Sequence, residues 1–129
     1  MSSINLEHIA PLGYERIMAK ELHHPERDQI DLSAVLEALS EPIRRDIVLY
    51  LLKQGEAACQ VFNDYAPKTN LSYHYARLRE AGVTRTRIVG PYRMISVRVD
   101  DLAARFPGLL DAIVAAAQAD SPPVEAQSD

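Results

Sequence analysis

The sequence predicts a mainly α-helical domain with one small β-hairpin, and three observations lead to that prediction. Apolar residues recur at helical spacing through most of residues 31–81. The period changes over residues 83–99, where β-branched residues alternate with arginines on both sides of the turn signal Gly90-Pro91. Helical spacing returns over residues 100–120. With 129 residues, the chain is long enough for one compact domain with a single core.

The first predicted elements are three helices. Residues 31–40 place apolar side chains at positions i, i+3, i+4 and i+7, which is one stripe of a helix. Ser40 then resembles an N-cap, Pro42 suits the first turn of a second helix, and that helix ends before Gly55. A third, shorter helix is predicted over residues 57–65. The residues expected to face the core are Leu32, Val35, Leu36, Leu39, Ile43, Ile47, Val48, Leu51, Val61, Phe62 and Tyr65.

The stretch PKTNLSYHYARLREAGV (67–83) predicts a helix that opens with small polar residues and ends at Gly82. At about 100° per residue, its apolar residues fall on one side. His74 lies on that side, so it is expected to be a structural, hydrogen-bonded histidine. The packed side carries Leu71, His74, Tyr75 and Leu78, and the opposite side carries Thr69, Tyr73 and Ala76.

The last elements are the hairpin and a helical segment with a predicted break at Pro107. A short helix, a tight turn and a polar-fronted helix make a helix-turn-helix, and a basic hairpin after it makes a wing. The sequence therefore predicts a winged helix-turn-helix. The hairpin residues expected to face inward are Ile95, Val97 and Val99.

The polar front of the 68–81 helix suits contact with DNA. A recognition helix reaches base edges from its N-terminal turns, where short polar side chains can approach closely and form hydrogen bonds. Arginines on a wing can neutralise phosphates. The alternative is a helix with an ordinary N-cap, Thr69 or Asn70, and a solvated face. The residues expected at DNA are Lys68, Thr69, Asn70, Ser72, Tyr73, Arg77, Arg85, Arg87 and Arg93.

The distribution of charge supports a polyanionic partner, although the net charge of −4 and the pI of about 5.5 do not. Between Lys68 and Arg98, seven basic residues and one acid give a charge of +6. The remaining seven basic residues and seventeen acids give −10. A basic block inside an acidic chain is what a local polyanion contact requires. A solvated charged face is the alternative.

Other function classes find little support in the sequence. No apolar run approaches the roughly 20 residues of a membrane span, and no signal peptide is recognisable, so we expect no membrane association. The single cysteine, Cys59, favours a reducing cytoplasm. There is no glycine-rich phosphate loop and no nucleophile elbow, and Ser72 and His74 face differently on their helix. We therefore expect neither an enzyme nor a cofactor.

Three motifs resemble the ArsR family of bacterial winged-helix repressors. ALSEPIRRDIVLYLL (38–52) looks like that family's Ala-Leu-Ser-Asp-Pro-x-Arg-x-x-Ile-x-x-x-Leu signature. KTNLSYHYARLREAGV (68–83) looks like its recognition helix, and DDLAARFPGLLDAIV (100–114) resembles a C-terminal segment of one branch. The resemblance covers roughly residues 24–118. It implies a homodimer that binds an imperfect inverted repeat in a double-stranded DNA operator and blocks transcription.

In such proteins the first and last helices usually build the dimer. The candidate interface here is the apolar surface of the last helix, with help from residues 32–39 or from the N-terminal extension. A two-fold operator needs a two-fold protein, which favours dimerisation over packing of this surface on its own core. The expected interface residues are Leu109, Leu110, Ile113, Val114 and Ala117.

The chain departs from the family pattern in two ways. Tyr73 stands where the family often has His, which implies a different operator preference. Many members sense metals through two Cys in Glu-Leu-Cys-x-Cys, but those positions hold Ala58 and Gln60 here, with Cys59 between them. A second family site uses Asp and His on the last helix, which has Asp111 but no His. We expect no metal at these sites. The inducer stays unknown, and a small molecule is the open alternative.

A few residues and boundaries keep alternatives open. Cys59 is a candidate redox residue, or a small buried hydrophobe. His23 and His24 could bind a metal, although adjacent histidines point apart. The rival function is a winged-helix module that binds another protein and lacks sequence-specific DNA binding. The predicted organisation is an N-terminal extension with helical potential over 1–24, the winged domain over 25–119 and a disordered tail over 120–129.

Overall fold

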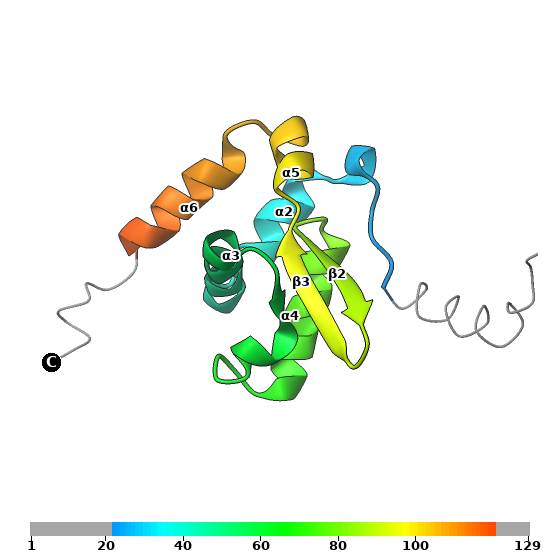
Figure 1. Ribbon diagram of the computed structural model, residues 1–129. Helices are drawn as coiled ribbons and strands as arrows, with labels where there is room; N and C mark the ends of the chain where they lie inside the picture. The colour runs from blue at the N-terminus through cyan, green and yellow to red at the C-terminus, as the bar shows by residue number, and fades with distance from the viewer. Residues whose placement is uncertain (1–21, 121–129) are drawn as a thin grey trace, which may run out of the picture.

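The structure, a computed structural model that describes residues 22–120, confirms a mainly helical winged fold with a small antiparallel sheet (Figure 1). The extension predicted over 1–24 and the tail predicted over 120–129 lie outside the described residues, except for residues 22–24 and Asp120. With η for a 3-10 helix, the elements are η1 (Arg27–Gln29), α2 (Leu32–Ala38), α3 (Pro42–Gln54), β1 (Ala57–Ala58), η2 (Cys59–Phe62), α4 (Lys68–Glu80), β2 (Thr84–Val89), β3 (Tyr92–Val97), α5 (Val99–Arg105) and α6 (Leu109–Asp120).

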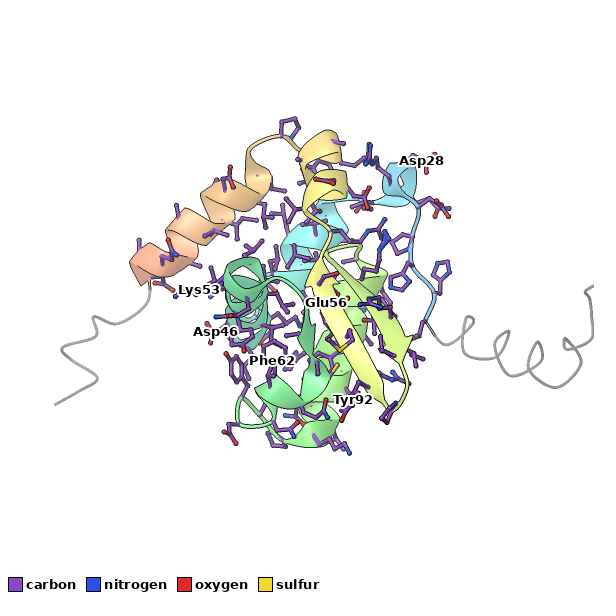
Figure 2. All side chains as sticks on the ribbon, viewed as in Figure 1. Asp28, Asp46, Lys53, Glu56, Phe62 and Tyr92 are labelled. Atoms are coloured by element: carbon purple, nitrogen blue, oxygen red, sulfur yellow. The ribbon has the colours of Figure 1, made fainter. Side chains whose placement is uncertain are left out.

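The three helices α2, α3 and α4 pack around one core that the sheet covers (Figure 1). Most of the periodic residues of α3 and α4 are buried as predicted, whereas Ile43, His74 and Tyr75 are half-buried. Gly82 ends α4 with a φ of +85°. Phe62 of η2 is fully buried and stacks edge-on against Tyr50 of α3 (Figure 2). The buried residues that fill the core of these helices are Val35, Ala38, Leu39, Ile47, Val48, Leu51, Leu71 and Leu78.

The sheet has three strands in the order β1-β3-β2, one more than the predicted hairpin. β2 and β3 form the wing and meet at Gly90, as expected. The helix predicted over 57–65 is wrong, because β1 pairs antiparallel with β3, with Ala57 opposite Ile95 and Ala58 opposite Met94. This pairing satisfies backbone groups on the inner edge of β3, and only the short η2 remains helical.

Several predicted inward-facing residues are exposed instead. Val61 is 45% exposed, and Leu32 and Leu36 on α2 are 43% and 46% exposed. Val99 lies in α5 rather than in the hairpin and is 46% exposed, while Tyr65 is at the edge of the core. These side chains have the right periodicity, but no second element covers them within the described part of the chain.

The predicted N-cap at Ser40 is also wrong. Glu41 is the N-cap residue of α3, and it makes no side-chain capping bond. The Ser40 hydroxyl instead donates to the carbonyl oxygen of Glu37 at 2.6 Å, which satisfies the end of α2. The turn between α2 and α3 therefore uses Ser40 to close the first helix rather than to open the second.

The break at Pro107 is confirmed, and α6 lies beside α3 on the side opposite the wing (Figure 1). No residue of α6 is fully buried. Among residues 22–120 no single helix is long and apolar enough to cross a membrane; α5 and α6 together meet that test by length and composition, as a pair bent by 110°.

Candidate nucleic-acid interface

The N-terminal half of α4 presents a polar surface to solvent. All five predicted residues of its first turns are exposed, whereas Leu71 and Leu78 on the opposite side are 2% and 0% exposed. Pro67 occupies the N-cap position and no side chain caps the helix. The first N–H groups of α4 therefore face outward with positive dipole character, which favours a phosphate. The exposed residues are Lys68, Thr69, Asn70, Ser72 and Tyr73.

Arg44 of α3 connects α3 to the end of α2 and to α4. Its side chain is 3% exposed, and its Nη1 donates to the carbonyl oxygen of Ala38 at the end of α2, at 3.3 Å. Its Nε donates to Nδ1 of His74 on α4, at 3.0 Å. Burial and the neighbouring Arg44 charge lower the pKa of His74. His74 is thus a structural, hydrogen-bonded residue, as expected, and its ring contacts that of the exposed Tyr73.

Three of the predicted phosphate-contacting arginines already have carboxylate partners. Arg77 donates to Glu37 at 2.7 Å, and this hydrogen bond raises the arginine's pKa. Arg87 on β2 forms a bidentate pair with Glu56, both bonds at 2.7 Å; the pair lowers the pKa of Glu56 (Figure 2). Before they can bind a phosphate, these arginines must exchange one anionic partner for another.

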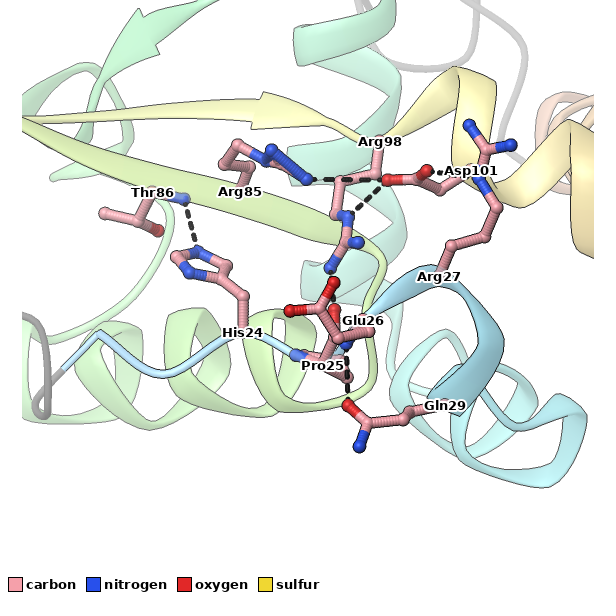
Figure 3. Close-up of polar contacts among 9 residues, drawn as sticks. All are labelled: His24, Pro25, Glu26, Arg27, Gln29, Arg85, Thr86, Arg98 and Asp101. Carbon is pink, nitrogen blue, oxygen red and sulfur yellow. Dashed lines mark hydrogen bonds and ion pairs between the residues drawn. The ribbon is translucent and has the colours of Figure 1, made fainter.

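Arg85, the third of these arginines, has Asp101 of α5 as its carboxylate partner. Asp101 lies at the base of the wing and also pairs with Arg27 and Arg98 (Figure 3). Arg27 and Arg98 lie at 2.7 and 2.8 Å from its oxygens, and Arg85 lies at 3.5 Å. The hydrogen bond from Arg27 is the largest cause of the lowered pKa of Asp101. Arg98 is 7% exposed and also donates to the Pro25 carbonyl, so its role is structural.

The same region ties the start of the described chain to the wing. The backbone N–H of Thr86, on the edge strand β2, donates to Nε2 of His24 at 3.0 Å (Figure 3). Burial, and then the Arg85 charge, lower the pKa of His24. Sequence reasoning considered His24 only as a metal ligand and missed this contact, because nothing local to residue 24 identifies its partner. Among residues 22–120, no three His, Cys, Asp or Glu side chains converge to hold a metal ion.

Lys68 at the start of α4 and Arg93 on β3 differ from these arginines. Both are exposed, and neither has an ion-pair partner within the described part of the chain. Their charges are free to meet a phosphate without first breaking an internal pair. Of the five predicted cationic contacts, these two are the ones that the fold leaves uncompensated.

Cys59 lies at the start of η2 and is half-buried. Burial raises the pKa of its thiol to about 11, against a weaker opposing effect of Arg93. The thiolate is the reactive form of cysteine, so this thiol is poorly suited to redox sensing at neutral pH. Its backbone carbonyl accepts a hydrogen bond from the Tyr75 hydroxyl at 3.1 Å, which attaches η2 to α4.

The predicted dimer surface lies on α6. Each of its five residues is half-buried, and three of them pack partly on the core of the same chain. A shallow cleft beside α6 also includes Leu36, the exposed leucine of α2. The surface residues are Leu109, Leu110, Ile113, Val114 and Ala117.

The helical core, the exposed polar helix and the basic hairpin together define a winged helix-turn-helix DNA-binding protein. No family model matches the chain. It is 35% identical over 89 residues to the uncharacterized HTH-type transcriptional regulator YceK of Bacillus subtilis (strain 168), which covers 67% of this chain and 88% of that protein. The chain therefore belongs to the helix-turn-helix transcriptional regulators.

Its fold is that of the ArsR family, as the sequence motifs indicated. The crystal structure of the ArsR family transcriptional regulator RHA00566 matches with a TM-score of 0.50 at 23% identity. The match covers 74% of this chain and 93% of that one. Both similar proteins are described as transcriptional regulators.

Proposed function

We propose that the protein is a homodimeric repressor that binds an inverted-repeat operator, with α4 in the major groove and the wing against the flanking backbone. The observation that carries this proposal is the exposed, uncapped N-terminal front of α4 on a buried helical support. Short polar side chains there, Ser72 among them, can form hydrogen bonds with base edges, and Tyr73 offers an aromatic face and a hydroxyl.

The ion pairs make the salt dependence of binding informative. If only Lys68 and Arg93 contact phosphates, a dimer has four such contacts and the log–log salt slope is about −4. If Arg77, Arg85 and Arg87 also leave their carboxylates, a dimer has ten contacts and the slope is about −9. The measured slope therefore reports how many of the paired arginines transfer to DNA.

Dimerisation through α6 follows from its incompletely covered apolar face. Val114 is half-buried, whereas its neighbour Ala115 is exposed. Val114→Asp places a charge in the proposed interface and should yield a monomer by analytical ultracentrifugation. Ala115→Asp, with the same added charge, should remain a dimer. A wild-type protein that sediments as a monomer at micromolar concentration would remove this part of the proposal.

The direct test measures fluorescence anisotropy of the full chain with the duplex upstream of its own gene and with a scrambled duplex. We expect about a thousand-fold preference for the native duplex. Ser72→Ala combined with Tyr73→Ala should abolish the preference and leave the dimer intact, while Ser33→Ala, an exposed serine on α2, should change neither. Equal affinity of the wild type and the double mutant for the specific site would contradict the proposal that α4 contacts the operator bases.

If both duplexes bind weakly and equally, sites selected from random DNA decide the matter. An enriched two-fold symmetric sequence supports the repressor, and no enrichment favours the protein-binding module. For the sign of regulation, a reporter gene placed behind the selected site should be expressed less when the protein is present.

A further inference from the structure

A cavity of about 590 Å³ lies beside the proposed DNA-contacting helix, among η2, the side of α4 that runs from Lys68 to Arg79, and strand β3. η2 and β3 lie side by side, and α4 passes beneath them (Figure 1). The half-buried side chains of Cys59 and Tyr75 give it an apolar wall. Its size falls in the range of small-molecule sites.

The cavity concentrates the uncompensated positive charge of this region. Segment 68–98 has seven basic residues. Four of them form ion pairs with Glu37, Glu80, Glu56 or Asp101, and the other three have no ion-pair partner among residues 22–120. These three, Lys68, Arg79 and Arg93, all line the cavity, and no described acid lines it.

Arg79 shows most clearly that the cavity favours an anion. Its side chain is half-buried, and its Nε is shielded from solvent without a hydrogen-bond acceptor in the described structure. A cation that is partly removed from water and lacks a counter-ion is costly, and a bound anion would offset that cost. The cationic groups come from both ends of α4 and from the wing, so an anion here would join elements that are distant in sequence.

We propose that this cavity binds a small organic anion, a phosphate ester or carboxylate with an apolar body, and that this ligand displaces DNA. The anionic group lies among Lys68, Arg79 and Arg93, and the body lies against Tyr75. A backbone phosphate of DNA shares the anionic chemistry, but it brings no apolar body to the wall of the cavity. The displacement, unlike the binding, rests on the proposed function, since Lys68 and Arg93 are proposed to contact both DNA and the ligand.

The first experiment measures binding without DNA. Phenyl phosphate, inorganic phosphate and neutral benzyl alcohol are titrated into the full chain by calorimetry. We expect saturable binding of one phenyl phosphate per chain, weaker binding of inorganic phosphate and none of benzyl alcohol. Absence of phenyl phosphate binding would overturn the proposal, and equal affinity for the two phosphates would overturn the role of the apolar wall.

Matched variants then locate the site. Arg93→Gln should weaken phenyl phosphate binding about tenfold or more, because it removes a charged donor. Arg85→Gln removes the same charge from the other wing strand, outside the cavity, and should change affinity less than twofold. Gln60→Glu, which adds an acid to the lining, should also weaken binding, whereas Gln54→Glu at the end of α3 should not. Equal effects within either pair would indicate non-specific charge attraction and overturn the site.

A final arm adds the selected duplex. Phenyl phosphate should raise the apparent Kd for DNA in the wild type and have a much smaller effect in Gln60→Glu. Binding of phenyl phosphate with no effect on DNA affinity would overturn the regulatory claim. A protein that binds phenyl phosphate in the cavity but binds no DNA sequence would refute the proposed function and leave the anion site standing.

Discussion

Replacing Arg44 with methionine should destabilise the domain, because Arg44 joins three helices from a buried position. Its guanidinium donates to the last carbonyls of α2, those of Glu37 and Ala38, and to the His74 imidazole on α4. The positive charge also sits at the negative end of the α2 dipole. Methionine keeps the length of the apolar stem and removes the charged head.

The magnitude follows from the geometry. The bond to His74 at 3.0 Å lies in the usual range and the bond to Ala38 at 3.3 Å is slightly long, while the contact to Glu37 at 3.5 Å is at the limit and contributes little. A hydrogen bond from a charged donor contributes about 1.5–3 kcal/mol, so the two bonds together contribute about 3–6 kcal/mol. Relief from burying an uncompensated cation offsets part of this loss. We expect a net loss of about 3 kcal/mol, which lowers Tm by about 12–24 °C in a domain of this size.

Thermal unfolding followed by circular dichroism measures this effect. Arg44→Lys keeps the charge but lacks the planar fork that reaches two helices, so its Tm should fall between the wild type and Arg44→Met. Lys53→Met removes an exposed cation from the same helix and should change stability by less than about 0.5 kcal/mol. A loss of under about 1 kcal/mol for Arg44→Met would refute the view that these bonds hold α2, α3 and α4 together.

Three further predictions concern Gly82, Cys59 and the pair His24 and His74. Gly82→Ala should cost more than about 1 kcal/mol in urea unfolding, because φ is +85° and the new Cβ would lie 2.6 Å from Cγ1 of Ile30; an unchanged midpoint would contradict it. Cys59 should react with iodoacetamide about a hundredfold more slowly in the native protein than in urea, since its pKa is raised from 9.0 to about 11; equal rates would contradict the burial. The lowered pKa values of His24 and His74 stabilise the fold above pH 6.5, and this contribution should be lost as the pH falls below 6.5 through the folded pKa values. Urea midpoints near neutral and mildly acidic pH should therefore differ less in the double His→Gln variant than in the wild type.

Sequence periodicity correctly predicts the helices whose residue pattern is complete within their own segment of the chain. α3 and α4 each carry a complete apolar stripe with a clear start and end, and the turn at Gly90 follows from the change of period. The helix predicted over 57–65 is wrong because Ala57 and Ala58 form a strand by pairing with Ile95 and Met94, which lie far along the chain. Its alanines have high helix propensity, so a tertiary contact decided the outcome.

The candidate site was predictable to a similar degree. The polar front of α4 follows from spacing alone, because a helix with one buried side must expose the other. The pairing of its charges does not, since Glu37 is 40 residues before Arg77 and Glu56 is 31 residues before Arg87. Counting charges along the chain shows that residues 68–98 carry a net positive charge. Only the three-dimensional structure shows which of these cations have no carboxylate partner.

This pairing explains how an acidic protein can be suited to DNA. The net charge of −4 gives the molecule as a whole no attraction for a duplex, and salt screens charges that lie more than a Debye length apart, so long-range attraction contributes little to encounter. Internal carboxylates also reduce the attraction of Arg77, Arg85 and Arg87 for arbitrary phosphates. Among the described residues, positive charge without an ion-pair partner remains at Lys68 on the uncapped start of α4, at Arg79 and at Arg93 on the wing. Binding should therefore require close docking of α4, which restricts affinity to duplexes whose base edges fit its polar front.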